Sequence, residues 1–547
     1  MKVFITTSGI GSRLGQYTEF MNKSMLKVGK KPVIAHIIDQ YPSNFEFVIT
    51  LGYKGDHIKQ FLTIAYPNHK FTFVNVDKYQ GEGTSQVYSQ LQAKEYLQEP
   101  FIYNDCDTIV ENLAKQVDIE NFDYDFLIGY NKISGLYDGF DYDETSKDNA
   151  NSYKITKIYQ KGASMTTMAS YIGIAGIYDW KTWWNCCERA VKEVDYHILN
   201  DTYVYINYKE HFSNIKTFIV DNWYDTGSVS GLITARKHFS SNKNDQLNVL
   251  DKYDQSIFII NNKVIKFFAN DDMVKKIMTH TNVISKFMPK ILDVTKNFFS
   301  YAFVTGNTAI TNIDRFRFAD ILEYYKENGL WDKTYSKYNF KKEQYDFWIT
   351  RTKNRVNKFK KMFNIEEYKN IFINGIKIPK EFTVDYILDK IQECKEWKEA
   401  NWTSWHGDFT LENILIDNNN NYSLIDCRQG YGNELYYGDK VYDYVKMNMN
   451  LLFNFSSIYN NLYNIVINDN NDIIHVDILV NSESTYCKEV LKKFVEADNI
   501  SYDYIEMLTG IIFLDLCPLF EPKLCKFLFY FGKYVLYSNM KNNLNFN

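Results

Sequence analysis

The sequence predicts an α/β fold for the first half of the chain and a two-lobed α+β fold for the second half. Three observations lead to this prediction. Short apolar runs alternate with helical patterns over the first 240 residues, which is typical of a mostly parallel sheet covered by helices. From residue 253 the pattern changes to hairpin-like strands and then to a long helical region. The total of 547 residues is long for one core and sufficient for two or three domains.

The N-terminal domain is expected at residues 1–240. Its strand candidates are KVFITT, FEFVITLGY and EPFIYNDCDTIV, and KPVIAHIIDQY is a helix candidate between the first two. The polar stretch SSNKNDQLNVLD that follows has no periodicity, so the linker is placed at 241–252.

The C-terminal domain is expected at residues 253–547. QSIFIINNKVIKFF indicates two strands joined by the turn Asn261-Asn262, and a helix and the strand candidate NFFSYAFV follow. FADILEYYKENGLW and the stretch 342–363 are helical patterns in the next part of the chain. We therefore expect a small sheet lobe at about 253–307 and a larger helical lobe at about 308–547.

The composition excludes several classes of function. The chain is 45% hydrophobic and 24% charged, with a net charge of −5, so a basic nucleic-acid-binding surface is not expected. Eight scattered cysteines without a CxxC pair, and no signal peptide at the start, indicate reduced thiols and a cytoplasmic protein. The apolar stretch 508–520 is too short to insert into a membrane and carries Asp515, so we expect a buried helix. The oligomeric state stays open, a homo-oligomer included.

A glycine-containing loop, TTSGIGSRLGQYT, follows the first strand candidate. Gly9 and Gly11 would let backbone N–H groups approach an anion closely, and Arg13 would add a positive charge. Lys23 follows shortly after. Two acids each follow an apolar, strand-like run, Asp107 in YNDCDTIV and Asp225 in WYDTGS. Acids at the carboxyl ends of strands lie at the mouth of a parallel sheet, where two of them could share a Mg²⁺ that holds nucleotide phosphates.

The first 235 residues resemble the sugar-phosphate nucleotidylyltransferase family, which has a Rossmann-like fold. The resemblance rests on SGIGSRLGQYTEFMNKSMLKVGKKPVI, QGEGTSQVYSQL and WYDTGSVSGLITA, in this order along the domain. It implies that Lys23 stabilises charge on the α-phosphate. The remaining roles that it implies are triphosphate binding by Ser8, Gly9, Gly11 and Arg13, base binding by Gly83, Mg²⁺ binding by Asp107 and Asp225, and binding of the second substrate's phosphate by Lys161.

This domain departs from the family pattern at two points. The loop begins Thr-Ser-Gly where the family more often has Ala-Gly-Gly, and Asn22 stands where a proline usually precedes the lysine. Neither departure removes a charge. A structural domain without activity, and a solvated surface position for Lys161, remain as alternatives.

A second set of polar residues lies in WHGDFTLENILID and the following SLIDCR. Asp408 and Asn413 are five residues apart, and Asp426 comes eighteen residues after Asp408. Phosphoryl transfer from ATP needs a carboxylate near the acceptor hydroxyl and oxygen ligands for Mg²⁺. An acid, an amide and a second acid in this order supply those groups.

This region resembles the aminoglycoside phosphotransferase and choline kinase family, relatives of the protein kinases. The resemblance implies that Asp408 is the catalytic base, that Asn413 and Asp426 bind Mg²⁺, and that His406 and Asp443 support the loop. It also implies that Lys266 in KVIKFF binds the ATP phosphates, with Lys263 as its competitor, and that YAFVTGN at 301–307 is the hinge against adenine.

The second half is the less complete match. No glycine-rich loop precedes Lys266, and no glutamate occurs between Lys266 and Glu323, so a partner for this lysine would have to be Asp271 or Asp272. A non-catalytic, kinase-like sensor domain is therefore an alternative.

Together the two resemblances predict a bifunctional enzyme that uses Mg²⁺, ATP and CTP or UTP. The C-terminal domain would phosphorylate a small hydroxyl compound, with a sugar favoured. The N-terminal domain would couple the sugar phosphate to the nucleotide and release pyrophosphate, making a precursor for a surface polysaccharide. A choline or ethanolamine kinase joined to a cytidylyltransferase, a transferase with a sensor domain, and an antibiotic-modifying kinase are the alternatives.

Overall fold

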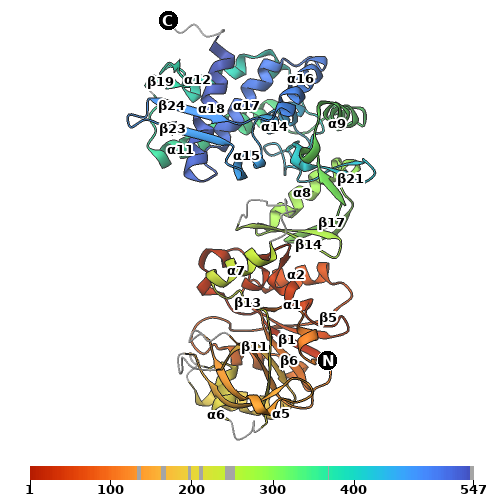
Figure 1. Ribbon diagram of the computed structural model, residues 1–547. Coiled ribbons are helices and arrows are strands. Elements are labelled where there is room, and N and C mark those ends of the chain that lie inside the picture. Colours follow the sequence, from red (N-terminus) through yellow and green to blue (C-terminus); the bar gives the residue numbers. More distant parts are fainter. Residues whose placement is uncertain are drawn as a thin grey trace. The chain divides into compact units, whose positions relative to one another are not determined.

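A computed structural model describes residues 1–131, 137–161, 168–194, 199–208, 214–240, 253–367 and 369–541. The predicted linker at 241–252 lies outside these residues. The chain forms two compact units, which can be followed by colour in Figure 1. The first consists of Met1–Val274 and Ile291–Phe303, and the second of Lys275–Lys290 and Val304–Asn547.

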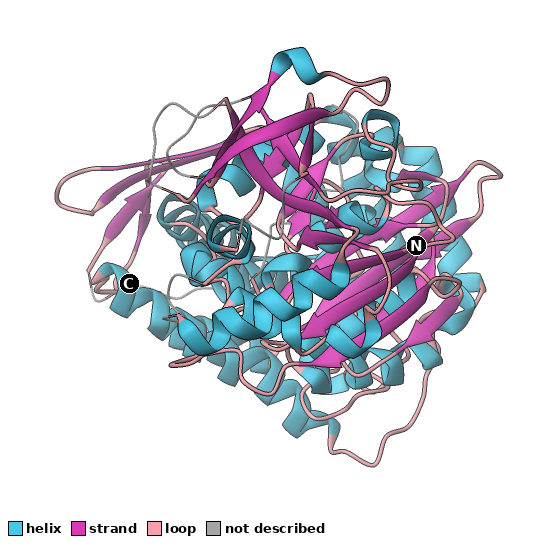
Figure 2. Ribbon diagram, turned by 90° about the horizontal axis from the view of Figure 1, so that it is seen from below, coloured by secondary structure: helices cyan, strands magenta, loops and turns pink. Residues whose placement is uncertain are grey.

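Nine strands within the described residues of the first unit form one sheet, in the order β5-β4-β1-β6-β11-β8-β12-β10-β9. Their bounds are β1 (Lys2–Thr6), β4 (Glu46–Leu51), β5 (Lys70–Asn75), β6 (Phe101–Asp105), β8 (Phe126–Tyr130), β9 (Gly139–Asp143), β10 (Tyr153–Tyr159), β11 (Ala169–Ile177) and β12 (Lys216–Ile219). Two short ribbons pair β2 (Lys27–Val28) with β3 (Lys31–Pro32) and β7 (Thr108–Val110) with β13 (Trp223–Asp225). The strands are magenta in Figure 2.

The direction of the strands differs between the two halves of this sheet. β5, β4, β1 and β6 run parallel, as predicted. β11 is antiparallel to β6 and β8, and β10 is antiparallel to β9 and β12, so the sheet as a whole is mixed and the prediction of a mostly parallel sheet was wrong for this half. Among the described residues between β8 and β11 there is no α-helix, and neighbouring strands that lack a crossover helix commonly pair antiparallel.

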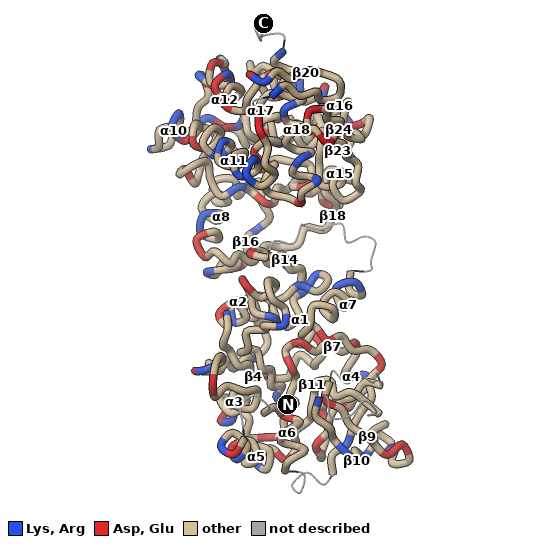
Figure 3. Tube along the Cα trace, turned by 90° about the vertical axis from the view of Figure 1, so that its left-hand side faces the viewer, with Lys and Arg blue, Asp and Glu red and all other residues tan. Residues whose placement is uncertain are grey.

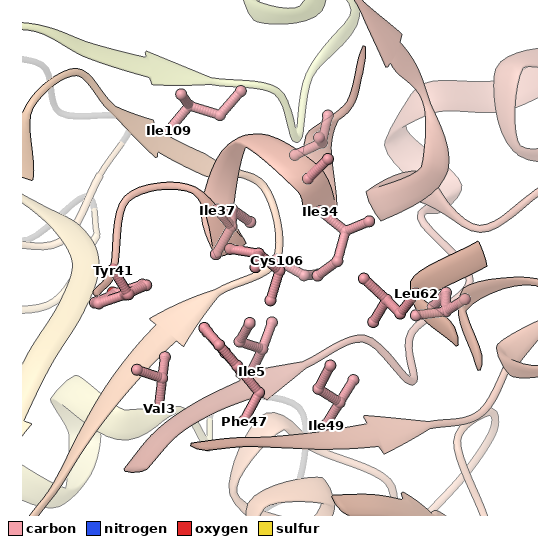
Figure 4. Close-up of a cluster of buried hydrophobic side chains, with 14 of the residues drawn as sticks. Val3, Ile5, Ile34, Ile37, Tyr41, Phe47, Ile49, Leu62, Cys106 and Ile109 are labelled. Atoms are coloured by element: carbon pink, nitrogen blue, oxygen red, sulfur yellow. The ribbon is translucent and has the colours of Figure 1, made fainter. Parts of the chain in front are cut away.

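Helices of the first unit pack against this sheet and cover its apolar side chains. They are α1 (Val33–Ile38), α2 (Gly55–Ala65), α3 (Gln86–Leu91), α4 (Leu113–Gln116), α5 (Trp180–Glu193), α6 (Asp201–Asn207) and α7 (Val229–Phe239). Figure 4 shows Ile5 of β1 and Ile49 of β4 pointing toward Ile34 of α1 and Leu62 of α2. Buried apolar residues at helical spacing thus fix α1 and α2 on the parallel half of the sheet.

A second, four-stranded sheet also belongs to the first unit. Its strands, in the order β14-β15-β17-β16, are β14 (Gln255–Ile260), β15 (Lys263–Phe268), β16 (Ile291–Val294) and β17 (Phe298–Ala302). Asn261 and Asn262 connect β14 and β15 with positive φ angles of 49° and 57°, the backbone conformation of a two-residue hairpin turn. The predicted hairpin is confirmed.

This small sheet shares its core with the nine-stranded sheet. Phe258, Phe267 and Phe298 are buried in the same cluster as the side chains of β1 and β4. The rings of Phe61 and Phe258 lie 5.3 Å apart, centroid to centroid, and those of His57 and Phe267 lie 4.9 Å apart. The sequence places these strands in the C-terminal domain, whereas their packing joins them to the first unit. The domain limits themselves stay a prediction.

The second unit is mostly helical. Its helices are α9 (Arg315–Glu327), α10 (Phe340–Tyr345), α11 (Arg351–Phe363), α12 (Val384–Glu393), α13 (Lys395–Glu399), α14 (Lys440–Leu452), α15 (Phe455–Tyr459), α16 (Ser482–Ala497), α17 (Tyr502–Leu516) and α18 (Pro522–Met540), while α8 (Asp271–Val283) begins in the first unit. Its strands are β18 (Gly306–Thr308), β21 (Ile414–Asp417) and β22 (Tyr422–Leu424) in one sheet, and β19 (Ile371–Ile373), β20 (Ile376–Ile378), β23 (Tyr463–Ile467) and β24 (Ile473–Ile478) in another.

The apolar stretch at 508–520 is a buried helix, as predicted. Most of it lies in α17, and its Asp515 accepts hydrogen bonds from Arg351 and Arg355 inside the unit. None of the helices in the part of the chain that is described has the length and apolar character needed to cross a membrane. Acidic and basic residues are interspersed along the chain (Figure 3), in keeping with the net charge of −5.

Candidate active sites

The glycine-containing loop of the first unit connects β1 to a 3₁₀ helix at Ser12–Thr18. Gly11 has a φ of 69°, and a Cβ there would lie 3.1 Å from the Cβ of Lys23, so this position favours glycine on two grounds. The Ser8 carbonyl accepts a hydrogen bond from the Tyr53 N–H at 2.9 Å. Gly52 passes so close that a Cβ there would lie 2.5 Å from the Ser8 oxygen. The loop is therefore held tightly against the end of β4.

Asn22 fixes the residues on both sides of the loop. Its side-chain Nδ2 donates to the carbonyls of Thr7 and Tyr53, both at 2.8 Å. Its Oδ1 accepts from the backbone N–H and the hydroxyl of Ser24 at 2.9 Å each. A proline, which the resembling family usually carries here, would make none of these bonds. The hydrogen bonds of the asparagine side chain instead tie the two chain segments together and hold the neighbouring Lys23 in place.

Lys23, Asp107 and Asp225 come together beside this loop. The Lys23 ammonium forms an ion pair with Asp107 Oδ2 at 2.6 Å. Pairing of β7 with β13 places Asp225 opposite Thr108. A Cβ at Gly227 would lie 2.5 Å from Asp107 Oδ2 and 3.1 Å from Asp225 Oδ1. The two carboxylate oxygens therefore lie close to one another and to the same point beside Gly227. The structure thus joins residues that are 84 and 202 positions apart from Lys23 in the chain.

The charges of these three groups act on each other. Burial alone would lower the pKa of Lys23, but Asp107 outweighs it and holds that pKa well above its ordinary value. Burial alone would raise the pKa of Asp107, but Lys23 keeps it below its usual range. Burial, and then the charge of Asp107, raise the pKa of Asp225. Because one carboxylate is left partly uncompensated, the pair is suited to a further cation.

The carboxylate oxygens of this arrangement are hard donors, which suit a divalent ion. Asp107 and Asp225 would hold Mg²⁺ together with phosphate oxygens of a nucleotide. In the described part of the chain, no group of three or more His, Cys, Asp or Glu residues gathers to hold a metal without such help. Tyr137 donates to Asp225 Oδ2 at 2.9 Å and orients it.

A second acidic cluster, which the sequence did not indicate, consists of Asp105 at the end of β6 and Asp201 at the start of α6. Tyr103 and Gln86 donate to Asp105, and Tyr171 donates to Asp201 Oδ2 at 2.7 Å. Burial raises the pKa of Asp201 to about 6. The only sequence signal for this cluster was the first acid of the YNDCD motif, Asp105, two residues before Asp107.

The remaining predicted residues of this domain lie further out. Arg13 is exposed on the 3₁₀ helix, and its guanidinium lowers the pKa of Asp107 after the stronger effects of burial and Lys23. Gly9 has open space around its Cα, with nothing within 4 Å of an added Cβ. Gly83 is in an exposed loop before α3, with a φ of 81°. Lys161 is exposed at the end of β10, where its backbone N–H donates to Asp138 Oδ1 at 2.5 Å.

In the second unit, the loop at 405–413 is held by a buried carboxylate. Asp443 of α14 accepts from the backbone N–H groups of His406 and Gly407, both at 2.7 Å. Trp331 Nε1 donates to the same carboxylate at 2.9 Å. His406 is fully buried, and its Nδ1 accepts from the Asp408 N–H at 3.3 Å. Burial lowers the pKa of His406 to about 4, so the ring is neutral and acts as an acceptor at this position.

Asp408 is bound on both of its oxygens. Asn413 Nδ2 donates to Asp408 Oδ2 at 3.1 Å and to the Asp408 carbonyl at 2.9 Å. Lys446 of α14, which the sequence did not indicate, forms an ion pair with Asp408 Oδ1 at 2.8 Å. Asp426 follows β22 with a φ of 61°, an uncommon backbone conformation for a residue other than glycine. The structure therefore brings Asp408 and Asn413 together, and the side chains of Asn413 and Asp426 carry oxygen atoms of the kind that Mg²⁺ prefers.

Lys266 lies on β15 in the first unit. It is opposite Ile257 and Phe299 in the sheet register, on the face that points away from α2. Its side chain is 6% exposed, and its ammonium lies 5.8 Å from the ring centre of Tyr301. The competitor Lys263 pairs with Asp293 at 2.9 Å and donates to the Ile64 carbonyl of α2, and thus has a structural role.

Comparison with known proteins identifies relatives of the N-terminal half. No protein-family model matches the chain. The chain is 25% identical over 179 residues to the bifunctional protein GlmU of Methanococcus maripaludis, covering 32% of this chain and 39% of that protein. It is 37% identical over 75 residues to a probable glucose-1-phosphate cytidylyltransferase of Bacillus subtilis, covering 13% of this chain and 30% of that protein. The matches thus span about a third of the length of these relatives.

Solved structures give matches over a similar part of the chain. A UDP-glucose pyrophosphorylase complexed with UDP-glucose is 15% identical, with a TM-score of 0.37, over 44% of this chain and 97% of that chain. The CTP:phosphocholine cytidylyltransferase of Streptococcus pneumoniae is 18% identical, with a TM-score of 0.35, over 43% of this chain and 98% of that chain. The N-terminal half of the chain resembles sugar-phosphate nucleotidylyltransferases.

Proposed function

We propose that the first unit transfers a nucleotidyl group from CTP or UTP to a sugar phosphate and releases pyrophosphate. The observation that supports this most strongly is the Lys23–Asp107 ion pair, 2.6 Å long, next to Asp225 and the loop that contains Gly11. Some of the sequence relatives are named as glucose-1-phosphate cytidylyltransferases, one of them as a probable one.

Each residue of the site has a distinct task in this reaction. The loop from Ser8 to Gly11 presents backbone N–H groups to the triphosphate, and Lys23 compensates the charge that develops on the α-phosphate. The sugar phosphate oxygen attacks the α-phosphorus while the bond to pyrophosphate breaks, so no proton has to be removed from the nucleophile. Asp107 and Asp225 would hold Mg²⁺, which supplies charge neutralisation for the departing pyrophosphate. Gly83 would contact the base and Lys161 the phosphate of the sugar.

The second unit is proposed to be a small-molecule kinase that uses ATP and Mg²⁺. Asp408 acts as the base that accepts the proton of the acceptor hydroxyl as that oxygen bonds to the γ-phosphorus and ADP leaves. Asn413 and Asp426 are the ligands for Mg²⁺ in this proposal. His406 and Asp443 hold the loop in the shape described above.

The two reactions are consecutive in their chemistry. A kinase that phosphorylates a sugar supplies the phosphate that a nucleotidylyltransferase consumes. Joining both on one chain raises the local concentration of the intermediate. The product would be an activated building block for a surface polysaccharide.

Two parallel assays on the full chain test this proposal. ADP release from ATP is measured over a panel of free sugars, polyols and amino alcohols, and pyrophosphate release is measured from CTP and UTP with sugar 1-phosphates. Asp408→Asn should abolish ADP release and leave pyrophosphate release within about twofold, because the base contributes orders of magnitude to one reaction only.

Three other outcomes would each identify which half of the proposal fails. Pyrophosphate release without ADP release in the wild-type protein, in preparations that bind ATP, would favour a sensor domain over a kinase. ADP release that persists in Asp408→Asn would exclude Asp408 as the base. No pyrophosphate release with any sugar phosphate and either nucleotide would overturn the transferase assignment.

A further inference from the structure

A small cavity lies in the second unit, apart from the loop at 405–426. It has a volume of about 110 Å³, whereas a single water molecule needs only about 10–15 Å³. Its walls come from the end of α11 and the residues that lead to β19, from the turn between β23 and β24, and from the middle of α18. None of the described residues that line it belongs to the loop at 405–426. The cavity is therefore large enough for a small organic ligand and is separate from the proposed active sites.

The inner wall of this cavity contains a buried lysine and a buried glutamate. The side chain of Lys533 is 4% exposed and that of Glu367 is 3% exposed, and Lys533 Nζ donates to Glu367 Oε1 at 2.9 Å. The Lys533 ammonium also lies 5.7 Å from the ring centre of Phe529, four residues earlier on α18. These contacts fix the ammonium at the wall of the cavity.

Both oxygens of Glu367 are shared with other groups. Its Oε1 also accepts from the Val384 N–H at 3.1 Å, and its Oε2 forms an ion pair with Lys360. Among the residues that the structure describes, Glu367 is the one hydrogen-bond acceptor of Lys533. An ammonium group carries three N–H donors. Two of the donors of Lys533 are thus left without an acceptor in the described part of the chain.

A second donor without a partner comes from the same helix. Tyr530 lines the cavity and is 3% exposed, and its hydroxyl makes no hydrogen bond to a described residue. Burial raises the pKa of Tyr530 to about 12, so the hydroxyl keeps its proton at neutral pH. Tyr530 and Lys533 are three residues apart on α18 and therefore lie on one side of the helix. This side of α18 offers the cavity donors that lack acceptors.

The buried groups next to the cavity carry one positive charge in excess. The carboxylate of Glu367 is matched by two ammonium groups, those of Lys360 and Lys533. Burial lowers the pKa of Lys533, Glu367 partly opposes this effect, and Lys360 adds to it. At the rim, the exposed residues Glu366 and Lys369 have opposite charges and are screened by solvent. A ligand in the cavity therefore meets a net positive charge.

We propose that this cavity binds a small anion, a compound with a carboxylate or a phosphate group, through the ammonium of Lys533 and the hydroxyl of Tyr530. The oxygens of such a group accept from both donors, and their charge compensates the excess of the buried groups. A cation would be repelled by the two ammonium groups, and water would satisfy the donors without compensating the charge. The site takes no part in the two proposed reactions and does not depend on them.

The test compares small compounds of similar size and different charge on the full-length protein. Acetate and inorganic phosphate are the anions, acetamide is the neutral match of acetate, and ethylammonium is the cation. The Kd is measured by ¹H saturation-transfer NMR for the carbon compounds and from the ³¹P line width for phosphate. At least one anion should bind about tenfold or more tightly than acetamide and ethylammonium, because its hydrogen bonds are charge-assisted. Whether acetate, phosphate or both bind decides between a carboxylate and a phosphate ligand.

Three variants assign the binding to the cavity. Lys533→Met keeps the length of the side chain and removes its charge, so the Kd of the anion should rise about tenfold or more. Tyr530→Phe removes only the hydroxyl and should raise this Kd about threefold or more. Lys523→Met is the matched control, because Lys523 also lies on α18 and over an aromatic ring, 5.1 Å from the centre of Tyr463, but is exposed. It should leave the Kd within about twofold of wild type.

Anion binding at the two proposed active sites is common to all of these proteins, so differences between them report on the cavity. Circular dichroism checks that each variant is folded, and Tyr530→Phe decides alone if Lys533→Met unfolds. Acetamide or ethylammonium that binds as tightly as both anions would overturn the inference. Anion binding that neither variant weakens would overturn it too, because the anion would then lie elsewhere. The absence of any anion binding would show that water alone fills the cavity, and would also overturn it.

Discussion

Asn22 shows how one side chain organises a catalytic loop. Four hydrogen bonds from this amide connect the end of β1, the loop after β4 and the short helix that begins at Lys23. Because the side chain is completely buried, these bonds have no competition from water. The position of the Lys23 ammonium therefore depends on a residue that is not itself charged.

The first prediction concerns this amide. Asn22→Ala removes all four bonds and leaves two carbonyls buried, which should lower the free energy of unfolding by about 2–4 kcal/mol. It should also reduce pyrophosphate release, since Lys23 is no longer fixed. Urea unfolding and the pyrophosphate assay measure both effects, and Asn121→Ala, at an exposed position, is the control. An unchanged midpoint of urea unfolding would show that water replaces the four hydrogen bonds of Asn22.

The second prediction concerns Lys23 itself. Lys23→Met keeps the apolar part of the side chain and removes the charge, so kcat for pyrophosphate release should fall by about 10²–10³-fold. Asp107 loses the partner that keeps its pKa low, but the fold should persist because methionine fills almost the same volume as the lysine side chain. A thermal melt serves as the folding control. Activity within tenfold of wild type would remove Lys23 from the catalytic group.

For single residues, the sequence predicts which charged side chains belong to a site better than it predicts which residues they contact. Lys23, Asp107 and Asp225 could be named from motifs, and the structure brings them together, although their roles stay predictions. Lys446 could not be named, because its place beside Asp408 depends on how α14 packs on the loop. Asp201 could not be named either, because it lies in α6 and meets Tyr171 of β11, a strand whose antiparallel direction the sequence pattern does not encode.

At the scale of elements, helix α2 has two neighbours. One side carries Leu62 against β1 and β4 (Figure 4), and another carries His57 and Phe61 against the small sheet. Gln60 and Asn297 exchange hydrogen bonds at the same contact, at 2.9 and 3.2 Å. Both the strand candidates and the hairpin turn could be predicted from the sequence. Their attachment to α2 could not, because an apolar strand face does not reveal which surface covers it.

The third prediction concerns pH. Burial lowers the pKa of His57 from 6.5 to about 4, and its Nδ1 is buried without a partner. Between pH 6.5 and 4, His57 is protonated in the unfolded chain but stays neutral in the folded chain. The free energy of unfolding should therefore fall by up to about 3 kcal/mol as the pH drops from 6.5 to 4. His57→Phe should remove this part of the pH dependence. Thermal melts of both proteins at pH 7.5, 6, 5 and 4 measure it, and parallel curves would contradict the prediction.

The fourth prediction concerns the packing of the small sheet. Phe258→Ala deletes a fully buried ring that meets Phe61, which should lower the free energy of unfolding of the first unit by about 3–5 kcal/mol. Phe316→Ala is the control, since the Phe316 side chain is 74% exposed. Chemical denaturation followed by circular dichroism gives both values. Equal values for the two variants would mean that this contact contributes little.

At the scale of the whole molecule, the fifth prediction concerns where the chain can be cut. A fragment that ends at residue 240 leaves the side of α2 with Phe61 uncovered, and exposed apolar patches of this kind promote aggregation. A fragment that ends at Phe303 keeps the small sheet and all of the first unit. The longer fragment should be monomeric in size-exclusion chromatography and melt cooperatively, while the shorter one should aggregate or melt at lower temperature. Equal behaviour would show that the small sheet is dispensable.

The shared core of the small sheet and the first unit also bears on how such a protein can arise and change. A recombination event at the polar linker would separate β14–β17 from the helix that covers them, so neither product would inherit a complete apolar surface. Successful exchange of the C-terminal half between related genes would require a breakpoint after Phe303, in the segment predicted as the hinge, or matching changes on α2. We therefore expect inherited breakpoints among relatives of this chain to lie near residue 303 and not near residue 240.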